Sequence, residues 1–153
     1  MKKQIYILLL IIFFGFYLFS QGTVDDIEMD LKVIPVGVCI ENNCFNLEIA
    51  DTFQKREIGL MNRKNMSNNN GMLFIFEKEG VYNFWMKKTL ISLDIIWIDE
   101  NYKIIHIQKN AQPCTIKQCE TFGPNQKAKY VLEINGGLSK EMGFEVGDKV
   151  KFR

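Results

Sequence analysis

Short β-prone segments separated by polar turn residues follow one another along most of the chain. The first two, residues 33–40 and 44–50, flank the turn-forming segment 41–43 and predict an antiparallel hairpin. A loop over 40–43 would place Cys39 opposite Cys44, where a cross-strand disulfide can form.

Residues 95–98 are apolar at every position, which is typical of a strand covered on both faces and therefore central in its sheet. With residue 99 they predict a second hairpin, formed with residues 102–108. The other predicted strands are 72–76, 81–87, 129–134 and a last one running through Phe152.

One segment has the signals of a helix. Asp51 is suited to the N-cap, Gln54 follows three residues later, and Gly59 lies near the end, so we expect a helix from Thr52 to about Leu60. A second short helix is expected after the turn 135–137, ending at Gly143.

Many short strands with one or two short helices indicate a mainly β fold. We expect a sandwich or a partly closed barrel of mostly antiparallel strands. Residues 110–128 form a long loop, of a kind that is often functional or held by a disulfide.

The first 22 residues have the pattern of an export signal. Lys2 and Lys3 precede fifteen uncharged residues, 5–19, which is short for a membrane span of about 20 residues. Small residues at both outer positions of 20–22 suit a signal peptidase. We therefore expect residues 1–22 to be a signal peptide, with an uncleaved anchor in the inner membrane through residues 5–19 as the alternative.

This leader implies a domain organisation and a location. Residues 23–31 are acidic and are expected to be a tether, and residues 32–153 a single β-rich domain. The protein would then be periplasmic or extracellular, touching the membrane only through an uncleaved leader.

Cysteine usage agrees with export. The four cysteines form two local pairs, and an even number in an exported chain favours disulfides. Four cysteines allow three connectivities; we favour Cys39–Cys44 and Cys114–Cys119 because local pairs meet easily. Free thiols packed as small apolar side chains are the alternative.

Charge excludes one class of partner. The formal net charge is +1, and loss of Lys2 and Lys3 with the leader would make it −1. A nearly neutral chain lacks the basic character of nucleic-acid binding proteins. We expect no nucleic acid, no cofactor and no metal.

The segment 82–87 is the first candidate binding surface. In a strand, Asn83, Trp85 and Lys87 share one face, opposite a plainly apolar one. An aromatic ring between polar groups is a common way to build a surface for a small ligand. The alternative is that Trp85 covers the core and Lys87 extends past it to solvent.

Asp94 is the second candidate. In a regular strand it shares a face with isoleucines, where an ionised carboxylate is costly unless it is paired. Lys87, Arg56 and Arg63 are possible partners. The pair would be either a buried structural ion pair or part of a pocket in which Asp94 has a perturbed pKa.

Arg56 and Arg63 are seven residues apart and would lie nearly on one face of a persisting helix. With Lys87 and Lys88 they suit a carboxylate, a phosphate or an acidic glycan, unless they are simply solvated or paired charges. The candidate ligand-binding residues are Arg56, Arg63, Trp85, Lys87, Thr89 and Asp94.

Other chemistry is less favoured. Methionines 61, 66, 72 and 86 cluster, but their spacing matches no copper site and methionine fills cores readily. His106 is the only histidine, so a zinc site is not expected. Cys114 and Cys119 lack the two-residue spacing of redox motifs. The sequence also lacks the nucleophile elbow, the phosphate loop and the zinc-protease helix motif.

Six segments together carry a resemblance to a known family. They are Ala-Asp-Thr at 50–52, Arg-Glu-Ile-Gly-Leu-Met-Asn-Arg at 56–63, Gly-Met-Leu-Phe at 71–74, the run 84–99, Tyr-Val-Leu-Glu at 130–133 and Gly-Gly at 136–137. The chain resembles the family known as domain of unknown function 192. The resemblance implies a small, often exported, β-sandwich-like domain and no settled activity. Lys88, Ser92 and Trp97 depart from it, where the family usually has Asn, Pro and Phe.

The functional expectation is a non-catalytic exported module that binds a small polar or anionic ligand or a partner protein of the envelope. An envelope hydrolase or lyase is the alternative, with Asp94 as acid or base and Lys87 or an arginine steadying an anion. A structural or assembly factor is the third class, and an extended apolar patch on the surface would indicate it.

Overall fold

The protein is described by a computed structural model covering residues 35–153. The predicted leader, the tether and the start of the domain at residue 32 lie outside the described residues. Within the described part, no helix is both long and apolar enough to cross a bilayer.

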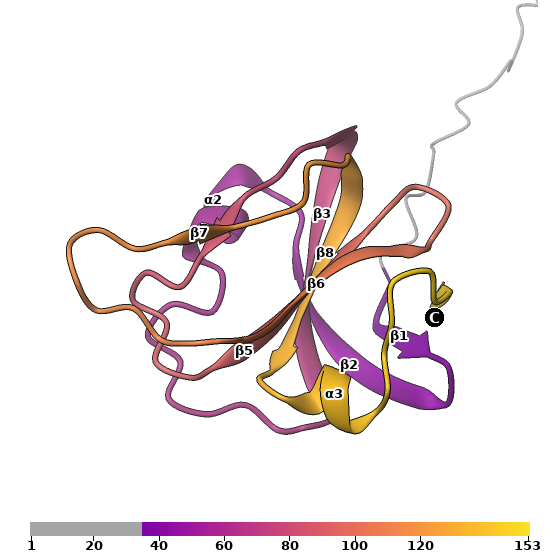
Figure 1. Ribbon diagram of the computed structural model, residues 1–153, viewed down its shortest axis with the longest axis horizontal. Coiled ribbons are helices and arrows are strands. Elements are labelled where there is room, and N and C mark those ends of the chain that lie inside the picture. Colours follow the sequence, from indigo (N-terminus) through magenta and orange to yellow (C-terminus); the bar gives the residue numbers. More distant parts are fainter. Residues whose placement is uncertain (1–34) are drawn as a thin grey trace, which may run out of the picture. The chain divides into compact units, whose positions relative to one another are not determined.

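The described chain is mainly β, as predicted. One curled sheet contains seven strands in the order β6-β5-β8-β3-β2-β1-β9, and β4 pairs separately with β7 (Figure 1). The strands are β1 Gly37–Ile40, β2 Asn43–Ala50, β3 Asn70–Gly80, β4 Phe84–Trp85, β5 Leu93–Ile98, β6 Ile104–Ala111, β7 Thr121–Phe122, β8 Ala128–Asn135 and β9 Val150–Phe152.

The two ends of the sheet nearly meet. Just before β9, Ile104 N donates to Asp148 O at 3.0 Å, and Val150 N donates to Tyr102 O at 2.8 Å. A bridge between Lys103 and Lys149 joins the same two segments. The expectation of a partly closed barrel is therefore confirmed.

The first hairpin is confirmed in register. Cys39 lies directly opposite Cys44, and Ile40 pairs with Asn43, so the turn is shorter than predicted and consists of Glu41 and Asn42. Strand β2 then pairs with β3 in parallel, an exception to the mostly antiparallel pairing, and α2 Phe53–Ile58 makes the connection.

The helix α2 is capped one residue later than predicted. Thr52 is the N-cap, and its hydroxyl accepts a hydrogen bond from Lys55 N at 3.2 Å. The helix ends at Gly59, whose φ of 46° is in the left-handed region that glycine adopts without strain. The second helix, α3 Leu138–Glu141, follows the turn after β8 as expected.

Alternation along the central strands divides the core into two clusters. The inner cluster fills the curled sheet; its buried members include Val38, Phe45, Leu73, Ile96, Leu132 and Phe144. The outer cluster lies on the other face of the same strands; its buried members include Leu60, Met72, Phe74, Met86, Ile95, Trp97 and Val131. Every residue of β5 is buried, which confirms its central place.

The segment 81–87 is not the long strand predicted. Only Phe84 and Trp85 pair, with Phe122 and Thr121, because their partner β7 is itself two residues long. This small sheet lies within the loop region on the side of α2 and covers the outer cluster (Figure 1).

Candidate functional site

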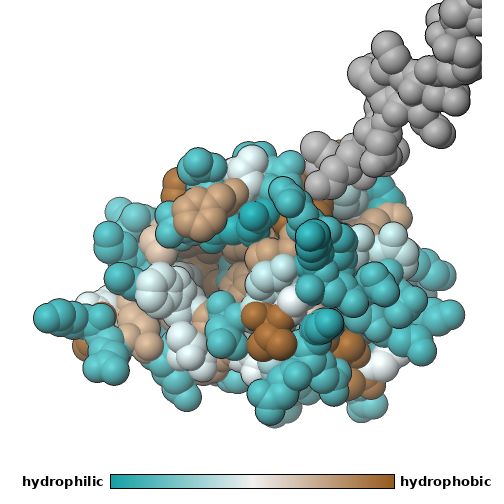
Figure 2. All heavy atoms as spheres, turned by 90° about the horizontal axis from the view of Figure 1, so that it is seen from above, coloured by the Kyte–Doolittle hydropathy of each residue, from teal (hydrophilic) through white to brown (hydrophobic). Residues whose placement is uncertain are grey.

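A pocket of about 650 Å³ opens on the outer-cluster side of the sheet. The face viewed in Figure 2 is hollowed, and apolar surface shows inside the hollow. The pocket is lined by α2 and the turn after it, by the second half of β3, by the segment leading into β4, and by β8. The lining residues used below are Phe53, Arg56, Ile58, Phe74, Phe76, Val81, Tyr82, Phe84, Trp85, Lys87, Thr89 and Glu133.

Aromatic side chains form the walls. Phe76 and Tyr82 stack with ring centroids 3.5 Å apart, and Phe74 meets Phe84 edge to face at 4.8 Å. The Trp97 indole donates a hydrogen bond to Tyr82 O at 2.7 Å, which fixes the segment above β5. These contacts favour a pocket that exists before a ligand binds, since the rings hold one another in place.

Arg56 joins α2 to the sheet at one side of the pocket. Its Nη1 donates to Asp51 O and to Ile75 O, both at 2.8 Å, and the guanidinium lies over the Phe76 ring, 5.1 Å from its centroid. These hydrogen bonds go to neutral carbonyl oxygens, so they leave the positive charge of Arg56 uncancelled.

Trp85, Lys87 and Thr89 come together at another side, as the sequence predicted for the first two. The Lys87 ammonium lies 4.8 Å from the centroid of the Trp85 ring, a cation–π contact. Trp85 is 48% exposed, while Thr89 is buried. Within residues 35–153, Lys87 makes no ion pair with a carboxylate.

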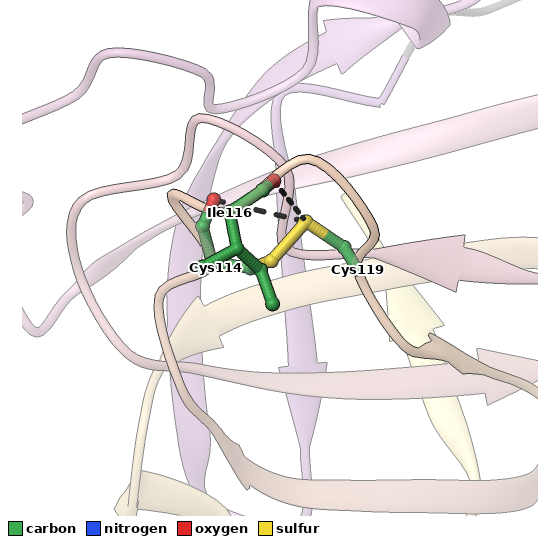
Figure 3. Close-up of a disulfide and its surroundings, with 3 residues drawn as sticks. All are labelled: Cys114, Ile116 and Cys119. Carbon is green, nitrogen blue, oxygen red and sulfur yellow. Dashed lines mark hydrogen bonds between the residues drawn. A yellow bond between two sulfur atoms is a disulfide. The ribbon is translucent and has the colours of Figure 1, made fainter.

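The disulfide loop holds this side of the pocket in place. Lys88 N donates to Cys114 O at 3.0 Å, and Cys114 N donates to Met86 O at 3.2 Å. Cys114 is bonded to Cys119, whose sulfur lies 3.7 Å from Ile116 O, inside a compact turn (Figure 3). The favoured connectivity is confirmed for both pairs, and the described chain has no free cysteine.

Glu133 is the pocket residue that the sequence analysis missed. It lies on β8 between Met72 of β3 and Ile95 of β5, on the face of the sheet that carries the outer cluster. It is 4% exposed, and burial alone raises the pKa of its carboxyl from 4.5 to about 8. No hydrogen bond or ion pair to this carboxyl occurs in the described part of the chain.

Two predicted site residues lie elsewhere. Arg63 makes a bidentate ion pair with Glu48 on β2, with N–O distances of 2.6 and 2.7 Å, and does not line the pocket. This hydrogen-bonded pair raises the pKa of Arg63.

Asp94 is fully buried on the inner side of β5, away from the pocket. Its carboxylate accepts hydrogen bonds from Asn110 N at 2.6 Å, Gly137 N at 2.9 Å and Ser139 N at 2.7 Å. The prediction that it pairs with Lys87 or an arginine is therefore wrong. Its partners are backbone amides, which sequence reasoning about charged side chains could not identify.

Two of the four clustered methionines and His106 pack against core residues. Met72 and Met86 are core residues of the outer cluster, and His106 packs 5.2 Å from Trp97. In residues 35–153, no group of three or more histidine, cysteine, aspartate or glutamate side chains is close enough to hold an ion.

Large apolar side chains are exposed around the mouth. Phe53 and Ile58 on α2, Val81 before β4, and Trp85 on β4 are each about half to two-thirds exposed, and all four line the pocket. Singly exposed apolar residues need no explanation, but four around one opening favour contact with an apolar part of a ligand or partner.

These features define a small curled-sheet domain with one preformed, aromatic-walled pocket. Two solved structures have this fold. A protein of unknown function from Novosphingobium aromaticivorans is 33% identical, with a TM-score of 0.69 over 77% of this chain and 84% of its own. A Sinorhizobium meliloti protein, provisionally described as a transcription regulator, is 30% identical, with a TM-score of 0.69 over 76% of this chain and 90% of its own.

The curated proteins with similar sequences include UPF0127 proteins. A UPF0127 protein from Pyrococcus horikoshii is 31% identical over 111 residues, 69% of this chain and 86% of its own length. A UPF0127 protein from Pyrococcus abyssi is 33% identical over 111 residues, 69% of this chain and 85% of its own length. The profile of the DUF192 family, described as "Uncharacterized ACR, COG1430", matches residues 36–152. The chain belongs to the DUF192 family, as the sequence resemblance indicated.

Proposed function

We propose that this domain is a binding module for a small organic anion, which occupies the pocket beside α2 and β4. The observation that carries the proposal is the convergence of Trp85, Lys87, Arg56 and Thr89 on one preformed cavity. Its volume of about 650 Å³ lies within the usual range for small-ligand sites.

The charge of the walls favours an anion. Lys87 lies beside an exposed ring without a carboxylate partner within residues 35–153, and Arg56 is hydrogen-bonded only to neutral carbonyls. A cation that is held in place but not neutralised is a ready partner for a carboxylate, because little side-chain order has to be gained on binding. The aromatic walls and the apolar mouth suit the body of the same ligand.

Benzoate is a suitable probe because it combines a flat apolar ring with a carboxylate. We expect benzoate to raise the melting temperature of the protein and to shift the Trp85 indole resonance in NMR spectra. Benzyl alcohol tests the ring without the charge, and benzylamine tests the opposite charge. Both should bind at least tenfold more weakly than benzoate.

Two variants test the named residues. Trp85→Ala and Lys87→Met should each leave the protein folded and weaken benzoate binding about tenfold or more, the worth of one good contact. The matched controls are Val146→Ala and Lys140→Met, which change exposed residues that do not line the pocket. Equal binding by all four variants, or unfolding of Trp85→Ala, would contradict the proposal.

Export is a second proposal, supported by the leader pattern and by two disulfides. Disulfides persist in oxidising compartments and are rare in the cytosol. Fractionation of cells producing the chain, with mass spectrometry of the purified protein, tests it. The expected result is an envelope or secreted protein lacking residues 1–22, or a membrane-bound one that retains them. A cytosolic protein with four free thiols would refute it.

A further inference from the structure

We propose that Glu133 is the ligand-recognition residue of the pocket, where its carboxyl donates a hydrogen bond to an oxygen of an anionic head group. The inference rests on the proposed function and names the substrate class more closely. The ligand is a small carboxylate with an apolar body, bound with its head inward and its body toward the exposed apolar side chains at the mouth.

The placement of Glu133 supports this role. It lies in the middle of β8 with strands on both sides, so its position is set by the sheet and not by a loop. Its side chain is on the face of the outer cluster, lines the pocket, and is 4% exposed. Within residues 35–153 no hydrogen bond to its carboxyl occurs, so its donor and acceptor capacity is open to a ligand in the pocket.

The protonation state follows from the surroundings. Removal from water disfavours the charged carboxylate, and the pKa of about 8 keeps Glu133 neutral near pH 7. A neutral carboxyl has one O–H to donate, whereas an ionised one can only accept. A ligand carboxylate can therefore approach a neutral Glu133 but would be repelled by an ionised one.

The other charged groups around the pocket complete the head-group site. Directly opposite Glu133, β3 presents Met72 and β5 presents Ile95, neither of which titrates. The titratable or charged groups that line the pocket are Arg56 and Glu57 on α2, Glu77 and Lys78 on β3, and Tyr82 and Lys87 before and after β4. Arg56 and Lys87 supply the positive charge that an anion requires.

The test is the pH dependence of benzoate binding, measured by titration calorimetry on the wild-type protein and on Glu133→Gln. Wild-type affinity should be nearly constant from pH 6 to 7 and about tenfold weaker at pH 9, because the binding-competent neutral form becomes the minority above pH 8. Glu133→Gln keeps a hydrogen-bond donor that does not titrate, so its affinity should vary less than about twofold over this range. Glu133→Met lacks the donor and should bind about tenfold more weakly at pH 7.

A direct titration of Glu133 distinguishes ligand recognition from a purely structural role. The carboxyl carbon of Glu133, followed by NMR, should titrate near pH 8 in the free protein. Saturating benzoate should move that midpoint upward, because a ligand that prefers the neutral form must stabilise it.

Contrary results separate the two proposals. A midpoint near 4.5, or the same loss of affinity at pH 9 in Glu133→Gln as in the wild type, overturns the role of Glu133. If benzoate still requires Trp85 and Lys87 in that case, the proposed function stands. If benzylamine binds in place of benzoate and gains affinity above pH 8, the pocket takes a cation and both proposals fall.

Discussion

Two buried carboxyl groups on neighbouring strands have opposite surroundings. Asp94 on β5 faces inward and is held by three backbone amides, whereas Glu133 on β8 faces the pocket and has no partner within residues 35–153. They are close in the sheet, because Ile95 pairs with Glu133 and Asp94 pairs with Ile134.

The difference shows that burial alone does not distinguish a structural carboxyl from a functional one. Asp94 joins β5 to the end of β6 and to the start of α3, so both of its carboxylate oxygens serve the fold. Glu133 retains its hydrogen-bonding capacity and lines a pocket. A carboxyl that faces a cavity in this way is a candidate for ligand recognition.

Removal of the Asp94 carboxylate should have the largest effect on stability. Asp94→Ala leaves three buried N–H groups without acceptors, and we expect a loss of about 5 kcal/mol or more, comparable to the stability of a small domain. Urea denaturation followed by tryptophan fluorescence measures it. Asp94→Asn retains an acceptor oxygen and should lose less. A loss below 1 kcal/mol in Asp94→Ala would show that the hydrogen bonds of Asp94 contribute little to stability, so that neither carboxyl has a structural role.

Glu133→Gln should have the opposite effect, one that grows as the pH rises above 4.5. The folded pKa of about 8 lies above the unfolded value of 4.5, so the folded state retains a proton that the unfolded state has lost between these values. Stability of the wild type should therefore fall between pH 4.5 and 8, relative to Glu133→Gln, by up to about 5 kcal/mol in total. Denaturation curves at pH 4, 6 and 9 test this, and a constant difference between the two proteins would contradict it.

Loss of either disulfide should lower stability by roughly 2 kcal/mol, because both close short loops. Only the pair Cys114–Cys119 contacts the pocket segment, through the backbone of Met86 and Lys88. Replacing both of these cysteines by alanine should therefore also weaken benzoate binding, while the same change at Cys39 and Cys44 should not. Equal benzoate affinities of the two double variants would show that the Cys114–Cys119 disulfide does not support the pocket.

Ser139 offers the smallest test. Its N–H binds Asp94, but its own hydroxyl is buried without a hydrogen-bond partner in the described structure. Ser139→Ala keeps the N–H and removes the unpaired hydroxyl, so stability should rise by up to about 1 kcal/mol. A lower melting temperature would indicate that the hydroxyl has a hydrogen-bond partner, and that the hydrogen bonds around Asp94 differ from those given above.

The strands could be predicted from the sequence where the pattern is local. The first hairpin follows from its turn residues, and the central place of β5 follows from its continuous apolar run. The small β4–β7 sheet could not be predicted, because its length depends on a partner strand far along the chain, as Phe84 pairs with Phe122. The N-cap was predicted one residue too early, at Asp51, because the neighbouring Thr52 is also a good capping residue.

The site could be predicted only in part. Strand alternation placed Trp85 and Lys87 on one face, and the structure brings both to the pocket. Glu133 was missed because a glutamate in a strand usually faces solvent. A signal was present: Val131, Leu132 and Ile134 make both faces of that strand apolar, so the reasoning used for Asp94 applied equally to Glu133.

The backbone conformation at Lys88 shows the structural cost of one departure from the pattern that the resemblance implies. Its φ of 58° is in the left-handed region, which asparagine, the residue expected here from the resemblance, adopts more readily than lysine. The departure thus concerns backbone strain as well as charge beside the pocket.

The pairing of β1 with β9 determines when one edge of the sheet becomes covered during synthesis. Strand β1 takes its outer neighbour from residues 150–152, which follow every other strand of the sheet along the chain and are therefore synthesised after them. Until they are in place, β1 is an unprotected edge, available to a second copy of the chain. A variant that lacks residues 150–153 should therefore associate with itself, although it keeps every residue of the pocket.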